Sequence, residues 1–342
     1  MRYSAFFVIL LMVVFGGGCD ESEQSNDSDS IDTAGYVVQT PYVIGVPSHF
    51  PALKSPKDNP LTVEKVELGK RLFFDRSLSI DSSVSCASCH HPNKAFSDTT
   101  ALSSGSLSRE TERNSPSLMN IAFHPVLMRE GAVQNLEIQV LSPLEGETEM
   151  AHNVVLACER LNRDSGYVKA FTNAFGDKAT PFTITRALAA YERTLIGGDA
   201  PYDAYLLGDS SILSEEQIRG LSLFKSNRLG CTNCHSGVLF TNFEIANNGL
   251  YSKYTDPGLF RLTVQNEDRG KFKTPSLRNV AITAPYMHDG SLTSLDDVLE
   301  HYASGGAGHE NQSNHIKGFK LTNKERKAII AFFDALTESA ID

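Results

Sequence analysis

Apolar residues recur at helical spacing along much of this 342-residue chain. In the segment TVEKVELGKRLFF, Val63, Val66, Leu68 and Leu72 form one apolar face, and Thr62 stands where an N-terminal cap is expected. The same pattern predicts further helices in TITRALAAYERTLI, SEEQIRGLSLFK, SLDDVLEHYAS and TNKERKAIIAFFDAL. The last three of these begin with Ser or Thr followed by acidic residues, which suits the first turn of a helix.

Loops rich in Gly, Ser and Asn separate the predicted helices. The long loops 99–115 and 241–274 lack the sustained alternation of apolar and polar residues that β-strands require. The sequence GDAP at 198–201 has the composition of a domain boundary. We expect an all-α protein of helices and long loops, divided there into two domains, 35–199 and 200–342.

The first residues have the composition of an export signal. Arg2 supplies a positive charge, and residues 5–15 are an apolar run too short to span a membrane. The GGGC sequence ending at Cys19 suggests cleavage of residues 1–18 and attachment of lipid to the new N-terminal cysteine. The aliphatic residue that usually stands three positions earlier is absent, so export without lipid is the alternative. Residues 19–34 are predicted to be a disordered tether.

The chain is acidic, with a formal net charge of −10. Loss of the predicted signal removes one Arg and makes the charge about −11. Such acidity argues against nucleic-acid binding and favours encounter with basic partners.

The cysteines form two tight pairs. The six cysteines are Cys19, Cys86, Cys89, Cys158, Cys231 and Cys234. An exported chain with several cysteines would ordinarily contain disulfides, but two Cys-x-x-Cys pairs are a poor arrangement for joining distant loops. In HNVVLACERL, Cys158 is in phase with Val154, Val155 and Leu161, which predicts a buried thiol.

Two alternatives for the cysteine pairs are weak. A four-cysteine zinc site requires both pairs within one small fold, yet 145 residues separate Cys86 from Cys231. A thioredoxin-type redox pair requires a βαβ context, which the helical pattern does not provide. Neither alternative gives a role to the histidine that directly follows each pair.

A repeated motif gives that histidine a role. GKRLFFDRSLSIDSSVSCASCHHPNKAFSD begins at Gly69, and GLSLFKSNRLGCTNCHSGVLFTN begins at Gly220. Cys-x-x-Cys-His attaches a c-type haem through two thioethers and places the histidine as the proximal iron ligand. The repeat therefore predicts two covalent haems, with His90 and His235 as proximal ligands. The thioethers are expected at Cys86, Cys89, Cys231 and Cys234.

Six motifs carry a family resemblance: RLFFDRSLSIDSSVSCASCH, RNSPSLMNIAF, NLEIQVLSPLEGETEM, YERTLIGG, CTNCHSG and KFKTPSLRNVAITAPYMHDGSLTSLDDVLEHY. In this order and spacing they resemble the bacterial dihaem cytochrome c peroxidase and MauG family, over roughly residues 45–338. The resemblance implies two cytochrome c-like domains, with a peroxidatic haem in the first and an electron-transfer haem in the second. It leaves open that the last helix packs on the N-terminal domain.

The resemblance also implies residues on the open face of the N-terminal haem. The family's glutamine, proline and glutamate fall at Gln139, Pro143 and Glu149. Glu149 would take a proton from one peroxide oxygen and return it to the other, and Gln139 would orient the peroxide. The neighbouring Glu145 and Glu147 are expected to be ordinary solvated residues of an acidic loop.

Many members of the family carry a blocking histidine about sixteen residues after the first proximal one. Here that position is Ser106, and residues 92–123 contain no histidine. His91 is too close to the attachment site to reach the far face, and His124 is expected to be structural. The N-terminal haem is therefore expected to be open even when oxidised, as in MauG-type members.

The distal ligand of the C-terminal haem is implied by the same register. It falls fourteen residues after His288, at Tyr302, where the peroxidases have methionine and the MauG-type proteins tyrosine. A phenolate stabilises ferric and higher states, whereas a thioether raises the potential. Met287, beside His288, is the competing candidate.

Two further features of the family bear on this chain. The tryptophan that the family places between its haems is replaced by Arg129, and the sequence contains no tryptophan. A tryptophan radical is thus excluded, which leaves direct tunnelling or a tyrosine to connect the haems and makes MauG-type chemistry less favoured. The family's calcium ion would be held by the Asn114 side chain and the carbonyls of Thr283 and Pro285.

The sequence thus favours a periplasmic peroxidase, with a lipid anchor at Cys19 as one alternative. Electrons would come from a small cytochrome c or cupredoxin and reduce hydrogen peroxide to water. The alternatives are MauG-like oxidation of a protein or small organic substrate, and a dihaem electron carrier without catalysis. Members of the family are often dimers, which leaves a homodimer open.

Overall fold

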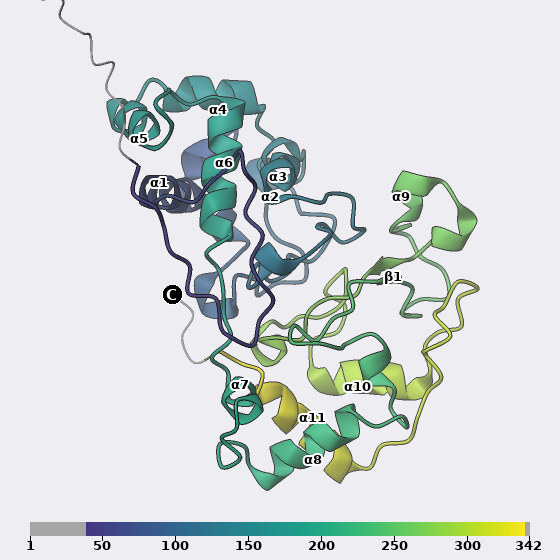
Figure 1. Ribbon diagram of the computed structural model, residues 1–342. Coiled ribbons are helices and arrows are strands. Elements are labelled where there is room, and N and C mark those ends of the chain that lie inside the picture. Colours follow the sequence, from purple (N-terminus) through teal and green to yellow (C-terminus); the bar gives the residue numbers. More distant parts are fainter. Residues whose placement is uncertain (1–38, 339–342) are drawn as a thin grey trace, which may run out of the picture. The chain divides into compact units, whose positions relative to one another are not determined.

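The computed structural model describes residues 39–338 (Figure 1). The predicted signal, Cys19 and the tether lie outside the described residues. The α-helices are α1 (Val63–Phe74), α2 (Leu136–Gln139), α3 (Leu141–Glu145), α4 (Val154–Leu161), α5 (Ser165–Phe175), α6 (Pro181–Glu192), α7 (Pro201–Leu206), α8 (Glu215–Phe224), α9 (Phe260–Thr263), α10 (Leu295–Ser304) and α11 (Asn323–Asp334). None of the helices in residues 39–338 is both long enough and apolar enough to cross a membrane.

Short elements complete the described part of the chain. Strands β1 (Ile245–Ala246) and β2 (Phe272–Lys273) pair antiparallel, with Ile245 opposite Lys273. The 3-10 helices are η1 (Arg76–Leu78), η2 (Cys86–Ser88), η3 (Pro92–Lys94), η4 (Ser106–Ser108), η5 (Ile121–Phe123), η6 (Cys231–Asn233), η7 (Asn266–Asp268) and η8 (Val280–Ile282). The protein is helix-rich with little sheet, as the sequence predicted.

Local capping explains where the predicted helices begin. The Thr62 side chain accepts from the Lys65 amide, and α1 buries Val66, Leu68 and Leu72. The Ser and Thr residues ahead of α8, α10 and α11 close capping boxes. Each cap satisfies amide groups that the first turn leaves without intrahelical partners. All five helices predicted from the pattern are thereby confirmed.

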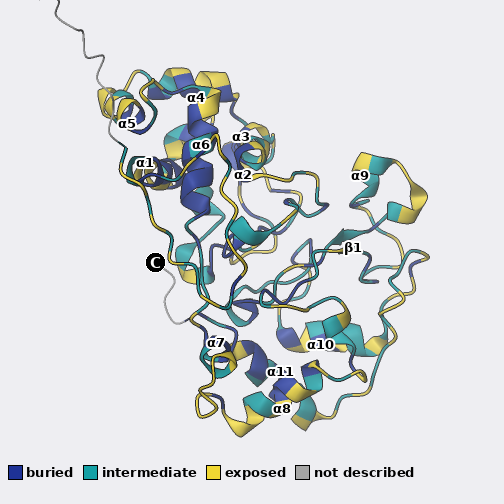
Figure 2. Ribbon diagram, in the orientation of Figure 1, coloured by how far each residue is buried: buried dark blue, intermediate teal, exposed yellow. Residues whose placement is uncertain are grey.

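The first hydrophobic core forms where α1 crosses α6, with α4 and α5 beside them. Large side chains at its centre, such as Phe73, Phe96 and Phe171, are fully buried. Most of α6 is buried, as its dark blue ribbon shows (Figure 2). Cys158 is 5% exposed and belongs to this core, as predicted. Val155 differs from the prediction: it is 51% exposed, because the buried face of α4 runs through Val154, Ala157 and Leu161 instead.

The second core repeats this arrangement. Here α8 packs against α11, with Phe224, Phe240 and Phe332 in edge and tilted ring contacts. The main contacts of α11 are with α8, η8 and α10. The last helix therefore packs within the C-terminal half, which differs from the suggestion that it packs on the N-terminal domain. The two cores lie on either side of residue 200, and the domain boundaries themselves stay a prediction.

A buried ionic cluster joins segments that are far apart in the sequence. Arg278 donates to both carboxylate oxygens of Asp203, at 2.6 and 2.8 Å, and to Glu338 at 3.3 Å. Asp203 also contacts His49 at 2.8 Å. Because these groups are buried and paired, they fix the segment after α6 against the end of the described chain.

Candidate active site

The two Cys-x-x-Cys-His segments fold into the same turn. In both, the first cysteine opens a 3-10 helix, η2 or η6. The His90 amide donates to the carbonyl of Cys86 at 3.0 Å, and the His235 amide donates to that of Cys231 at 2.9 Å. In each of the two segments, a tight turn thus brings the two cysteines and the histidine close together.

Both histidines are oriented through one ring nitrogen. His90 Nδ1 lies 2.8 Å from the carbonyl oxygen of Phe96, and His235 Nδ1 lies 3.1 Å from that of Phe240. Burial lowers the pKa of each imidazole below its usual value. A neutral ring that donates from Nδ1 leaves Nε2 as the free electron pair, which is the arrangement of a metal-ligating histidine.

The four cysteines of the two turns are unpaired thiols. Burial raises the pKa of Cys89 and of Cys231 to about 11, and that of Cys86 higher still. A reactive redox pair requires a lowered thiol pKa, so this alternative is disfavoured. Cys86 packs on the first core and Cys231 on the second, so the two pairs do not converge on one four-cysteine zinc site.

Glu149 faces the first attachment turn. Burial is the main cause of the raised pKa of Cys86 and of Cys89, and the charge of Glu149 adds a smaller contribution to both, which indicates that the carboxylate lies in their neighbourhood. The side chain is half-buried and makes no hydrogen bond to any residue in 39–338. Burial, with a smaller contribution from Glu112, raises its own pKa. Glu145 and Glu147 are exposed, as expected.

Gln139 and Pro143 lie on the two short helices that precede Glu149. Gln139 ends α2, and its Nε2 lies 3.8 Å from Met128 Sδ. Pro143 lies within α3, and its carbonyl accepts from the Met150 amide at 3.1 Å. The turn that carries Glu149 is therefore tied directly to the helix that carries Pro143.

The position of the blocking histidine is held by a buried serine. The Ser106 amide donates to the carbonyl of Glu149 at 2.7 Å, and Ser106 Oγ donates to that of Met150 at 3.1 Å. Gly105 packs so closely that a Cβ would lie 2.1 Å from the Thr148 carbonyl oxygen. This loop thus supports the backbone at Glu149.

The two histidines nearest in sequence to His90, His91 and His124, have structural contacts. His91 Nε2 lies 3.6 Å from Asp98 Oδ1. His124 packs edge-on against Phe243, and its Nδ1 lies 3.3 Å from the Lys273 ammonium. Burial lowers the pKa of His124 to about 3, so it is neutral at ordinary pH.

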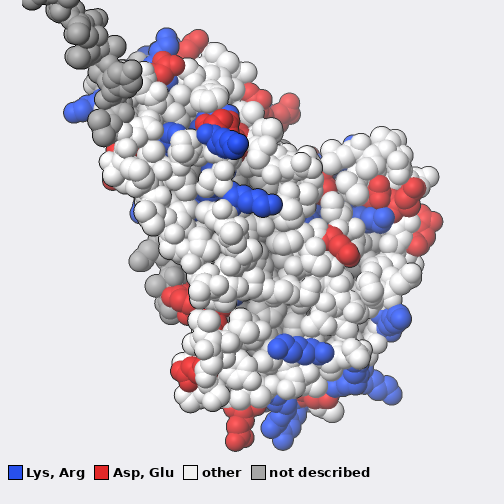
Figure 3. All heavy atoms as spheres, viewed as in Figure 1, with Lys and Arg blue, Asp and Glu red and all other residues white. Residues whose placement is uncertain are grey.

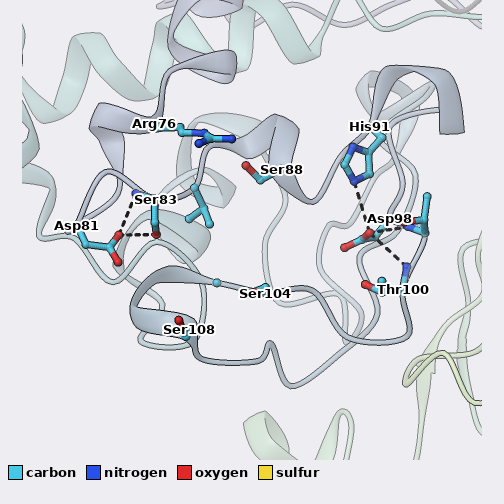
Figure 4. Close-up of a pocket in the computed structure, with 12 residues that line it drawn as sticks. Arg76, Asp81, Ser83, Ser88, His91, Asp98, Thr100, Ser104 and Ser108 are labelled. Atoms are coloured by element: carbon cyan, nitrogen blue, oxygen red, sulfur yellow. Dashed lines mark hydrogen bonds and ion pairs between the residues drawn. The ribbon is translucent and has the colours of Figure 1, made fainter.

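A polar pocket of about 450 Å³ lies beside the first attachment turn (Figure 4). Hydroxyl and charged side chains line it, among them Arg76, Ser88, His91, Asp98 and Ser104. Asp98 Oδ1 also accepts from the amides of Thr99 and Thr100, and these hydrogen bonds stabilise the turn that follows Asp98. The pocket brings solvent to the Ser88 side of the turn.

Tyr302 faces the second attachment turn. The charges of Cys231 and Cys234 raise its pKa, after the larger effect of burial. Asn248 hydrogen-bonds to Tyr302, and its Nδ2 lies 3.3 Å from Met287 Sδ. Both candidate ligands therefore meet at Asn248, a residue that the sequence pattern did not single out.

Aromatic side chains gather next to Met287. His288 stacks on Phe272 with ring centres 4.1 Å apart, and Tyr254 lies 5.9 Å from the same imidazole. Tyr251 donates to Asp289 Oδ2 at 2.5 Å. A phenol bonded to a carboxylate has an acceptor for its proton, and Tyr251 has this arrangement.

Comparison with known proteins identifies the family. A family model described as di-haem cytochrome c peroxidase matches residues 63–211. The chain is 39% identical over 290 residues to the methylamine utilization protein MauG of Methylorubrum extorquens, across 82% of this chain and 80% of that protein. It is 36% identical over 323 residues to the cytochrome-c peroxidase IdrP1 of Pseudomonas sp. strain SCT, across 85% of each.

The chain belongs to the di-haem cytochrome c peroxidase and MauG family. A solved MauG-like protein associated with microbial copper homeostasis has the same fold, with a TM-score of 0.82 and 34% identity. The match covers 88% of this chain and 97% of that one. Membership makes the protein a dihaem peroxidase-type oxidoreductase with two c-type haems, and the family includes both peroxidases and MauG-type oxidases.

The residues present fit two haems. Each turn offers two unpaired thiols for thioethers and one imidazole whose Nδ1 is already bonded, which leaves Nε2 for iron. Cys86, Cys89 and His90 would hold the first haem. Cys231, Cys234 and His235 would hold the second.

The residues expected to bind calcium do not fit that ion, because the Asn114 oxygen expected to bind it is already hydrogen-bonded. The Asn114 side chain and carbonyl both accept from the Arg129 guanidinium, at 3.0 and 2.7 Å. The other two expected ligands are the backbone carbonyls of Thr283 and Pro285, so Asn114 supplies the one side-chain ligand of the expected set.

Besides Asn248, the sequence pattern did not single out Glu192. Glu192, at the end of α6, is 6% exposed, and its charge raises the pKa of Cys86. Burial raises its own pKa to about 8, and its Oε2 has no partner in residues 39–338. The YERT motif contained it, but no local pattern distinguishes a buried glutamate near the end of a helix from an exposed one.

Proposed function

We propose that the protein is a peroxidase that reduces hydrogen peroxide to water with electrons from a small cytochrome c or cupredoxin. The observation that carries this proposal is the Glu149 carboxylate, which lies near Cys86 and Cys89, without a hydrogen-bond partner among the described residues and with a raised pKa. A carboxylate held in this way is suited to proton transfer rather than to structure.

When bound, the N-terminal haem would supply the iron that binds peroxide and the electrons that cleave its O–O bond. Glu149 would accept the proton of one peroxide oxygen and donate it to the other, which leaves as water. Gln139 would orient the peroxide, and Pro143 would limit access to the same face. Two electrons and two protons are consumed for each peroxide and two waters are released, so the protein must be re-reduced by its donor.

The open face of this haem is supported by Ser106. Its hydroxyl and amide are already bonded to the backbone at Met150 and Glu149, and a serine is a poor iron ligand. His91 is turned toward Asp98, as Figure 4 shows, and so is not a substitute. We infer that peroxide reaches the iron without prior reduction of the other haem.

The second haem would take electrons from the donor. Tyr302 is the favoured distal ligand and Met287 the alternative, because the family register puts the ligand at Tyr302 and this tyrosine lies near Cys231 and Cys234. For transfer between the haems, Tyr251 with Asp289 is the alternative to direct tunnelling, since the guanidinium of Arg129 is not readily oxidised.

A second function is favoured by Tyr302 itself. Phenolate ligation stabilises oxidised iron, which suits MauG-like oxidation of a protein or small organic substrate. The polar pocket beside Ser88 is a candidate place for a small organic substrate. The absence of tryptophan from the sequence argues for the peroxidase instead.

The charge of the chain and its expected export suggest the setting. A protein with a net charge of −10 is suited to a basic donor, and the predicted signal would deliver it to the periplasm, free or lipid-anchored at Cys19. On the face drawn in Figure 3, acidic side chains gather beside α9 and basic ones toward α8 and α11. Donor docking is therefore proposed to depend on a local patch, and a homodimer remains open.

Turnover of peroxide with reduced cytochrome c tests the proposal. Glu149→Gln is expected to lose about 10²–10⁴-fold in turnover, because the amide cannot exchange the proton. Glu147→Gln, two residues away and exposed, is the matched control and should retain full activity. An electron carrier without catalysis would show no turnover in any form, and undiminished turnover in Glu149→Gln would remove Glu149 from the mechanism.

A further inference from the structure

Asn114 lies against two equivalent hairpins, one from each half of the chain. The hairpins are closed by the bridges Leu127–Val133 and Tyr286–Leu292. Each hairpin contains a methionine with positive φ, Met128 at 66° in the first and Met287 at 78° in the second. The residue that follows is Arg129 in the first hairpin and His288 in the second. Arg129 and His288 therefore occupy the same position in the repeat.

Both of these residues hold Asn114. The Asn114 amide donates to the His288 carbonyl at 2.9 Å. Arg129 Nη2 donates to the Asn114 carbonyl at 2.7 Å and to its Oδ1 at 3.0 Å. Asn114 Nδ2 donates to the Thr100 carbonyl at 3.1 Å. All four polar atoms of this buried asparagine are thus engaged, and its two oxygens both face one cation.

The charges around Arg129 are already balanced. Arg113 pairs with Glu130 at 2.6 Å and with Asp256 at 2.6 Å. The Lys273 amide donates to the Arg129 carbonyl at 2.6 Å. Three cations, Arg113, Arg129 and Lys273, therefore stand among three carboxylates, Glu130, Asp256 and Asp289. A divalent ion added here would leave two positive charges uncompensated.

We propose that the Arg129 guanidinium is this protein's built-in replacement for the calcium ion of its family, and that the protein functions without calcium. Calcium requires oxygen ligands at about 2.3–2.6 Å, and the Asn114 oxygen that would supply one is bound by a guanidinium. Arg129 forms no salt bridge with any carboxylate of residues 39–338, and its Nε has no partner there, so its charge is directed at Asn114.

Protonation of Arg129 is secure at neutral pH. Burial and the nearby Arg113 lower its pKa to about 10, which still leaves the guanidinium charged. Burial and Arg129 lower the pKa of Lys273 to about 8, so that side chain is the first of the three cations to lose its charge as the pH rises.

Calcium analysis of the haem-loaded protein tests the inference. The wild-type protein, prepared with calcium and then dialysed, should hold no stoichiometric calcium, and EGTA should change neither its thermal midpoint nor the spin state of its haems. Arg129→Ala frees the Asn114 oxygens and removes one positive charge. It should bind one calcium per chain at least roughly tenfold more tightly than the wild type, with a calcium-dependent rise in thermal midpoint.

A control variant distinguishes the hydrogen bonds of Arg129 from its positive charge alone. Lys273→Met removes a neighbouring cation but leaves Arg129 on Asn114, and should gain no calcium. Arg129→Gln replaces Arg129→Ala if the alanine variant fails to fold. One tightly bound calcium in the wild type, with a spin-state change on its removal, would overturn the inference, as would equal calcium gain in Lys273→Met.

Discussion

Gly69 lies so close to Ala187 that a Cβ on the glycine would stand 1.9 Å from the alanine carbonyl oxygen. Gly220 meets Ala328 at the same 1.9 Å in the other half. These contacts are where α1 crosses α6 and where α8 crosses α11. The conformational freedom of glycine is not what matters here, because only the absence of a side chain allows the helices to approach.

Replacement of either glycine should therefore separate a helix pair. Gly220→Ala is expected to lower the free energy of unfolding by about 1–3 kcal/mol or more, because backbone lies in the way of the new methyl group. Gly45→Ala is the control, since nothing lies within 4 Å of its Cβ position. Denaturant unfolding of the haem-loaded proteins measures the free energy of unfolding of both variants. If Gly220→Ala were as stable as the wild type, the close contact between Gly220 and Ala328 would be contradicted.

The pH dependence of peroxide turnover should report Glu149. Its pKa is raised above the ordinary 4.5, mainly by burial. The carboxylate that accepts the proton is then present only above this raised pKa, so kcat/KM should fall as the pH is lowered through it. Glu112→Gln removes the second cause and should move this acidic limb to lower pH. A limb that stays in place in Glu149→Gln would assign it to another group.

Glu192 should make the folded protein less stable as the pH rises. Its folded pKa is about 8 against an ordinary 4.5, so the folded state binds the extra proton between these values. Stability from this group is complete below about pH 4.5 and is lost as the pH rises through 8, by roughly 3–5 kcal/mol. Glu192→Gln should remove this part of the pH dependence, which unfolding at several pH values measures. Identical slopes in the two proteins would refute the assignment.

The potential of the C-terminal haem should depend on Tyr302. Tyr302→Met replaces a phenolate by a thioether and should raise the potential by a sizeable part of the about 0.8 V that axial ligands span. Met287→Leu is the control and should leave that potential nearly unchanged. Redox titration distinguishes the two, and the opposite pattern would make Met287 the ligand.

Local features of the sequence predicted much of the fold. Caps such as Thr62 and Ser294 involve residues within one helical turn, so the beginnings of the helices were readable. The helices α2, α3, α5, α7 and α9 were not predicted. In α2, α3 and α9, four or five residues carry little periodicity. The end of α6 at Glu192 was also missed, because the apolar pattern continues into Leu195 and Ile196.

The candidate site was predictable where the motif repeats and not where distant segments meet. The attachment turns follow from the two pentapeptides, and Glu149 followed from the family register. The contact of Asn248 with Met287 joins residues 39 positions apart, and that of Arg129 with Asn114 joins residues 15 apart through a side chain. Neither contact has a local signature, since both depend on how two loops pack.

Electron paramagnetic resonance of the fully oxidised protein tests the central claim most directly. With Ser106 at the blocking position, the haem at His90 should give a high-spin ferric signal that hydrogen peroxide removes. The haem at His235 should give a low-spin signal whose g-values change in Tyr302→Phe. A low-spin, six-coordinate haem at His90 that does not react with peroxide would contradict the account.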